Sequence, residues 1–141
     1  MSDGLRLLQH PAPDEVEACL AQASRIDTLP ARLEVVSERL LGRPYLSFPL
    51  VGGPDTAEAL VTRLDAFDCV TFAESVLALG AAADPEDFGA RLSALRYREG
   101  RVRWADRNHY MTEWIRRNVR AGHVRRVLPD HWVWADPPRT L

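Results

Sequence analysis

The sequence predicts a helix-rich α+β domain with a small antiparallel sheet. Apolar residues recur at three- and four-residue spacing in five stretches, which is the period of a buried helix face. Between them, three short stretches have strand-like composition or alternation. At 141 residues, with 46% hydrophobic and 27% charged residues, the chain is long enough for one domain with its own core. We expect residues 1–141 to form this single domain, with an irregular lead-in at 1–13 and an irregular tail at 135–141.

The predicted elements follow from local signals along the chain. The first helix covers residues 14–24 and buries Cys19 as a small apolar residue. The others run from Pro30 to Gly42, from Cys69 to Gly80, from the Asp84 cap through Leu95, and from the Asn108 cap to Gly122. Residues 43–54, with three prolines and two glycines, predict an extended loop. Strands are expected at 56–64, 101–104 and 124–134, with the late strands forming the sheet. An open edge of that sheet would pair with a second copy as a homodimer.

Composition excludes several classes of protein. A net charge of −2 argues against a nucleic-acid binder, although ten arginines lie between residues 96 and 126. A solvated, salt-bridged helix face is the favoured interpretation of these arginines over an anionic-polymer site. The two cysteines, Cys19 and Cys69, form no disulfide framework or metal-type pair, so neither metal nor cofactor is predicted. No run has the length of a membrane span, and Met1-Ser2-Asp3-Gly4 does not resemble a signal peptide. The sequence as written predicts a cytoplasmic protein, or a periplasmic or extracellular one if a leader has been removed.

The stretch Phe67-Asp68-Cys69-Val70 places a cysteine at the start of a predicted helix. Asp68 is a good N-cap residue, which makes Cys69 the first residue inside the helix. The free N–H groups and the dipole of a helix start favour an anion there, including a thiolate. Cysteine is also one of the most frequently buried residue types, so a nucleophile and a core residue both remain open.

A second candidate stretch runs Arg107-Asn108-His109-Tyr110-Met111-Thr112-Glu113-Trp114. A cysteine nucleophile needs a general base nearby in space, and the histidines after Cys69 are His109, His123 and His131. Taken alone, His109 is better interpreted as orienting its own loop through a hydrogen bond. Trp114 shares helical spacing with Met111 and Ile115, which favours a core position. Glu74 is expected to pair with an arginine of residues 96–98.

Four stretches together resemble a known family. They are Gly42-Arg43-Pro44-Tyr45, residues 64–74, Leu95-Arg96-Tyr97-Arg98-Glu99-Gly100 and residues 107–114. In this order they are similar to the N-acetylmuramoyl-L-alanine amidase-like branch of the NlpC-type, papain-like cysteine peptidases. The resemblance implies a cysteine amidase that cuts the bond between N-acetylmuramic acid and L-alanine, with a muramyl peptide as the partner.

The resemblance also implies roles for individual residues. Cys69 would be the nucleophile on a central helix packed against a sheet, and His109 would act as acid and base. Arg107 and Tyr110 would hold the sugar or the stem carboxylate. Asp68 would orient a partner or, more simply, cap the helix. Trp114 would stack on the sugar if it is not in the core.

The chain departs from the family pattern in its second half. The family's catalytic histidine lies on a downstream strand after a Gly-Asp turn, and no such segment precedes Leu141. The implied fold is therefore a truncated papain-like one. Three interpretations remain open: an amidase in which His109 or His131 supplies the base, a degenerate relative that binds without cutting, and a purely structural domain.

Overall fold

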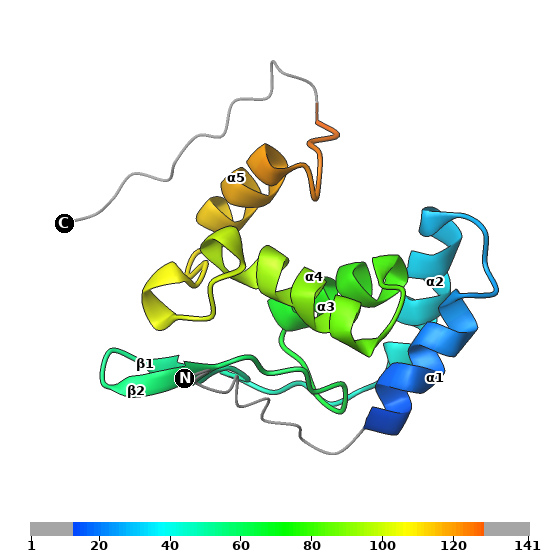
Figure 1. Cartoon of the computed structure of the whole chain (residues 1–141), viewed down its shortest axis with the longest axis horizontal. Helices are drawn as coiled ribbons and strands as arrows, with labels where there is room; N and C mark the ends of the chain where they lie inside the picture. The colour runs from blue at the N-terminus through cyan, green and yellow to red at the C-terminus, as the bar shows by residue number, and fades with distance from the viewer. Residues whose placement is uncertain (1–12, 129–141) are drawn as a thin grey trace.

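The computed structural model describes residues 13–128 as a helix-rich α+β fold, as the sequence predicts. In chain order the described elements are α1 (Pro13–Ala23), α2 (Leu29–Leu40), β1 (Val51–Gly53), β2 (Thr56–Ala59), α3 (Cys69–Ala81), α4 (Pro85–Arg96), the 3-10 turns η1 (Arg98–Gly100) and η2 (Trp104–Asp106), and α5 (Met111–Ala121). Figure 1 shows α3 and α4 in the middle of the molecule, with α1 and α2 on one side and the hairpin and α5 on the other. The predicted lead-in and tail lie almost entirely outside the described residues.

Helix α3 is the centre of the packing. It contacts α1, α2 and α4, and side chains on most of its circumference are buried. Its start at Cys69 is fixed by a capping box: the Asp68 carboxylate accepts from the Thr71 backbone N–H at 2.8 Å, and the Asp68 N–H donates to the Thr71 hydroxyl at 3.0 Å. The predicted cap and first residue of this helix are confirmed.

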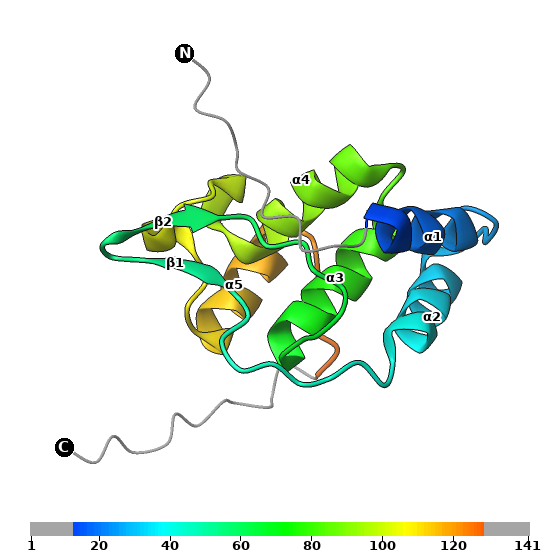
Figure 2. The same cartoon turned by 90° about the horizontal axis from the view of Figure 1, so that it is seen from below.

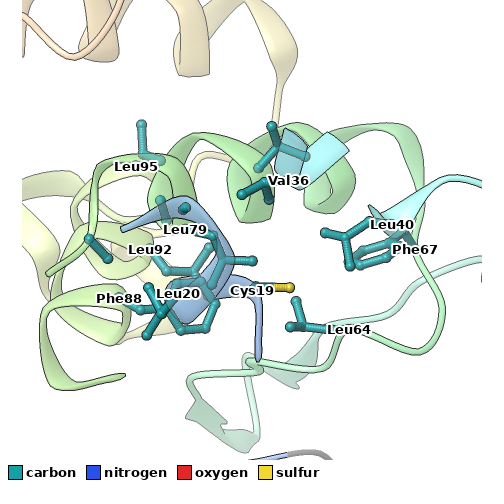
Figure 3. Packing of buried hydrophobic residues seen from close by; sticks show 14 of the residues in the cluster. Cys19, Leu20, Val36, Leu40, Leu64, Phe67, Leu79, Phe88, Leu92 and Leu95 are labelled. Carbon is teal, nitrogen blue, oxygen red and sulfur yellow. The ribbon is translucent and has the colours of Figure 1, made fainter. Parts of the chain in front are cut away.

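The core lies where α1, α2, α3 and α4 meet. Figure 3 shows Cys19 among leucine side chains and Phe67, and the Cys19 side chain is fully buried. Burial raises the pKa of the Cys19 thiol above its ordinary value. Its predicted role as a small core residue is confirmed. Leu64 and Phe67 carry the segment before α3 into the same cluster, which ties Cys69 to the core from its N-terminal side.

The strand predicted at 56–64 is confirmed in part, as β2 (Thr56–Ala59), but the sheet forms earlier in the chain than predicted. Strands β1 and β2 make an antiparallel hairpin in which Val51 pairs with Ala59 and Gly53 with Thr56 (Figure 2). The prediction of a sheet built from late strands is wrong within the described range: residues 101–103 are not a strand, and η2 follows them. Residues 124–128 are not a strand either, and the rest of the predicted strand 124–134 lies outside the described residues. Pairing of two copies through a sheet edge stays a prediction.

The hairpin depends on Gly52. Its φ of 128° is a conformation that L side chains rarely adopt, and a Cβ there would lie 2.8 Å from the Glu58 Cα on the opposite strand. Because backbone atoms cannot move aside cheaply, only glycine fits this position. The hairpin therefore brings Glu58 close to the β1 backbone.

Helix α5 begins later than predicted. Its N-cap is Tyr110, not Asn108. The Asn108 amide instead donates to the Leu95 carbonyl oxygen at 3.0 Å and accepts from Arg117 at 2.8 Å. The predicted end is confirmed, because Gly122 adopts the left-handed conformation with φ of 79°. Within the described part of the chain, no helix is long and apolar enough to cross a membrane.

Candidate active site

Cys69 is an exposed cysteine at the first position of α3. It lies in an open pocket of about 380 Å³, here called the Cys69 pocket. This pocket is lined by Leu40, Leu41, Gly42, Arg43, Tyr45, Phe67, Asp68, Cys69 and Phe72. Of the two cysteines, one is therefore accessible to a ligand and the other is buried in the core.

Tyr45 is held beside Cys69 by backbone pairing. The chain at Tyr45 runs parallel to Phe67, with the Leu46 N–H donating to the Phe67 carbonyl at 2.9 Å and the Phe67 N–H donating to Pro44 at 3.1 Å. The Tyr45 side chain is 73% exposed. Sequence reasoning gave this residue no role, although it lies in one of the stretches that carry the family resemblance. Only the backbone pairing with Phe67 shows that Tyr45 lies beside Cys69, and the local sequence carries no signal of that pairing.

His109 lies in a different pocket. Its ring Nε2 is 2.8 Å from the Trp104 carbonyl oxygen, and its ring meets the Trp104 indole edge to face with centroids 4.8 Å apart. This second pocket, of about 340 Å³, is called the His109 pocket. It is lined by Phe48, Pro49, Leu50, Asp68, Val70, Thr71, Glu74, Arg96, Arg107, Asn108 and His109. Asp68 lines both pockets.

The structure therefore brings Cys69 and Asp68 together but not Cys69 and His109. Within residues 13–128, no hydrogen bond joins Cys69 to a histidine. His131 lies outside the described residues. The Asp68 carboxylate is used by Thr71, from which it accepts both the backbone N–H and the hydroxyl at 2.8 Å. This is the capping role that the sequence favoured for Asp68.

Arg107 is committed to an ion pair with the hairpin. Its guanidinium donates twice to the Glu58 carboxylate, at 2.8 and 2.7 Å, and the Tyr97 hydroxyl donates to the same carboxylate at 2.7 Å. Burial raises the pKa of the Tyr97 phenol well above its ordinary value, and the bond to Glu58 raises it further. These bonds tie β2 to α4 and to the loop that carries His109.

Trp114 and Tyr110 lie in contrasting environments. The Trp114 side chain is buried, and its indole N–H donates to Glu74 at 2.9 Å. The other Glu74 oxygen accepts from Arg96 at 2.8 Å, which confirms the predicted partner of Glu74. Tyr110 is 73% exposed at the start of α5. Of the substrate-binding residues suggested by the sequence, Tyr110 is thus free to meet a ligand, whereas Trp114 packs in the core.

No cluster of three or more histidine, cysteine, aspartate or glutamate side chains in residues 13–128 has the arrangement of a metal site. The chemistry available at the Cys69 pocket is that of a thiol at a helix start. The backbone N–H groups of the first turn of a helix lack intrahelical acceptors and can hold a negatively charged oxygen.

Residues 35–131 match the family described as AmiA-like, N-acetylmuramoyl-L-alanine amidase-like. The matched range is more than half of the chain and contains both pockets. The chain belongs to this amidase-like family. No curated protein matches the sequence.

Several solved structures are similar to this chain, and one of those described next is named an amidase. A protein from Legionella pneumophila is 26% identical over 77% of this chain, with a TM-score of 0.68. An N-acetylmuramoyl-L-alanine amidase from Bacteroides uniformis is 32% identical over 60% of this chain, with a TM-score of 0.54. A Bacteroides fragilis protein described as a candidate xylanase is 33% identical over 61%, with a TM-score of 0.53. This chain spans only 37%, 38% and 40% of the lengths of these three proteins, respectively.

Proposed function

We propose that this chain is the nucleophile-bearing part of a cysteine amidase that hydrolyses the bond between N-acetylmuramic acid and L-alanine in peptidoglycan fragments. The observation that carries the proposal is the exposed Cys69 at the first position of α3, inside the range that matches the amidase-like family. A purely structural domain would have no need to keep this sulfur accessible beside an open pocket. Assignment to the NlpC-type, papain-like group is part of the same proposal.

The proposed reaction has two steps. The Cys69 thiolate attacks the carbonyl carbon of the muramoyl lactyl group, and the backbone N–H groups of Cys69 and Val70 hold the oxyanion. The carbon–nitrogen bond breaks, and the nitrogen of L-alanine leaves as an amine after taking a proton from the general acid. Water then attacks the thioester, which releases the muramic acid carboxylate and restores the thiol.

Among the described residues no histidine forms a hydrogen bond with Cys69, so substitutions are needed to identify the general base. His109 would have to leave the Trp104 carbonyl oxygen before its Nε2 could serve Cys69. His131 is the second candidate. Glutamine substitutions of His109 and His131, made one at a time, separate the two: the variant that lacks the base loses turnover, while the other keeps it.

The substrate would enter the Cys69 pocket, where Tyr45 is an exposed aromatic residue of the lining. Tyr45 lines this pocket, so its ring can contact a sugar or stem peptide bound at Cys69. Arg107 is held by Glu58, and its contribution to binding would be indirect, through the position of the His109 loop.

A second candidate function is binding without hydrolysis. It is favoured by one observation: among the described residues, the Cys69 sulfur is open and makes no hydrogen bond with a histidine. A muramyl dipeptide titration combined with an assay for released L-alanyl peptide distinguishes the two functions. The amidase proposal expects release by the wild type and by Cys19→Ala, but not by Cys69→Ala. Binding with no release by the wild type would support the second candidate.

A further inference from the structure

Three arginines converge on one buried carboxylate in the loop between α4 and α5. Asp106 is fully buried, and its Oδ1 accepts from the Arg98 Nε at 2.8 Å while its Oδ2 accepts from the Arg103 Nε at 2.6 Å. The Arg101 guanidinium lies 3.6 Å from Oδ1. We refer to these four residues as the Arg98 cluster.

The guanidinium groups of this cluster are anchored on one side and open on the other. The side chains of Arg98, Arg101 and Arg103 are 48%, 45% and 62% exposed. One arginine would satisfy Asp106, and each additional one adds repulsion between like charges. Anchoring reduces the rotamer entropy that a free arginine loses when it binds a ligand. The arrangement therefore suits an external anion better than it suits stability alone.

The chain segment that carries the cluster has a surplus of positive charge. Residues 96–128 contain ten arginines, and Arg96 and Arg107 are neutralised by Glu74 and Glu58. The eight remaining arginines face three carboxylates in this segment, Glu99, Asp106 and Glu113, which leaves five positive charges. Figures 1 and 2 both place this segment, from η1 to α5, at the end of the molecule away from α1 and α2.

We propose that the Arg98 cluster is a binding site for a flexible anionic polymer with repeated phosphate groups. The guanidinium fork matches the oxygens of a phosphate group. A polymer fits better than a small anion because Arg116, Arg117 and Arg120 of α5, which follows the cluster in the chain, add to the surplus charge. A flexible polymer also fits better than nucleic acid, because the chain as a whole carries −2 and its acidic remainder would repel a long stiff duplex.

The site is independent of the hydrolase proposal. None of Arg98, Arg101, Arg103 and Asp106 lines the Cys69 pocket or the His109 pocket. Polymer binding there would hold the protein on an anionic matrix without occupying the Cys69 pocket. Binding by this site can therefore be measured with Cys69→Ala as well as with the wild type.

Calorimetric titration with linear polyphosphate tests the proposal. The double variant Arg101→Gln/Arg103→Gln removes two charges and leaves Arg98 paired with Asp106. The matched control is Arg39→Gln/Arg91→Gln, because each of these arginines also pairs with a carboxylate, Glu15 or Asp87, and neither lines the Cys69 pocket or the His109 pocket. We expect the test variant to bind about tenfold more weakly or worse, since two charge-assisted contacts are lost, and the control to bind as the wild type does.

A variant that removes a negative charge should have the opposite effect on polyphosphate affinity. Glu99 lies 3.1 Å from Arg101 and partly neutralises it, so Glu99→Gln should tighten polyphosphate binding. Poly-glutamate and a DNA duplex, titrated at equal charge, are the alternative polymers, and both should bind more weakly than polyphosphate. No wild-type binding, equal losses in both double variants, no tightening in Glu99→Gln, or a preference for poly-glutamate or the duplex would each overturn the proposal.

Discussion

Glu74 and Arg96 form an ion pair of 2.8 Å in which both side chains are almost completely buried, at 2% and 3% exposure. The pair joins α3 to α4, and its remaining polar atoms are also used: Glu74 accepts from Trp114, and Arg96 donates to the Val61 carbonyl oxygen at 2.7 Å. It holds the helix that begins at Cys69 in a fixed position relative to the rest of the fold.

Removing one partner of this pair should be costly. Glu74→Gln leaves the Arg96 charge buried without a counter-ion, and we expect a loss of about 3–5 kcal/mol in the free energy of unfolding. Urea denaturation measures it. Glu38→Gln, on the exposed surface of α2, is the control and should change stability little. A loss below about 1 kcal/mol for Glu74→Gln would contradict a structural role for the pair.

Gly52 provides a test of the hairpin. Gly52→Ala places a Cβ against the Glu58 backbone and should cost roughly 1–3 kcal/mol, through both the clash and the positive φ. The control is the neighbouring residue, because a Cβ at Gly53 meets no atom within 4 Å. Thermal melts of Gly52→Ala and Gly53→Ala compare the two. Equal stability of the variants would show that the close approach of β1 and β2 is not needed.

Two cap variants separate the contribution of Asp68 to stability from its effect on the reactivity of Cys69. Asp68→Ala and Asp84→Ala each remove a carboxylate that accepts a backbone N–H at 2.8 Å, at the starts of α3 and α4. Both should lose about 1 kcal/mol of stability. Only Asp68→Ala should change the rate at which iodoacetamide modifies Cys69 in the folded protein. The idea fails if Asp84→Ala changes that rate by the same factor.

Acid should destabilise the protein partly through Asp106. Burial raises the pKa of the Asp106 carboxyl, but hydrogen bonds from Arg98 and Arg103 outweigh burial, and the pKa in the folded state lies below its ordinary value. The stability from this group is therefore present above the unfolded pKa of about 3.9 and is lost as pH falls through the folded pKa. Unfolding curves between about pH 2 and pH 6 should show that the free energy of unfolding falls less with decreasing pH in Asp106→Asn than in the wild type. Parallel profiles would contradict this assignment.

The parts of the fold that sequence reasoning predicted correctly depend on neighbouring residues. The starts of α3 and α4 follow from Asp68 and Asp84, and the end of α5 follows from Gly122. The Glu74–Arg96 pair is an exception: its residues are 22 positions apart, and the sequence suggested it as a structural salt bridge with an arginine of residues 96–98.

The parts that were missed depend on contacts between distant residues. Strand β1 forms in a proline- and glycine-rich stretch, where Gly52 fits against Glu58 and the local sequence shows only a loop, whereas β2 lies within the strand predicted at 56–64. Residues 101–103 look strand-like, yet the following 3-10 turn places Asp106 among three arginines. Asn108 resembles a cap, but Leu95 and Arg117 use its side chain.

The same distinction holds at the candidate site. Local signals identified Cys69, whereas Tyr45 beside it depends on pairing with Phe67 across the intervening hairpin. The separation of His109 from Cys69 also follows from a long-range arrangement: Arg107 is held by Glu58, and the His109 ring turns to Trp104.

The most direct test of the central claim is to trap the covalent intermediate. Wild-type protein is mixed with a muramyl peptide, quenched in acid and digested, and the peptide that contains Cys69 is examined by mass spectrometry. The account predicts an N-acetylmuramoyl group on Cys69 as a thioester, and none on Cys19, which is buried. An acyl group on a different residue, or turnover with Cys69 unmodified, would contradict the assignment of Cys69 as the nucleophile.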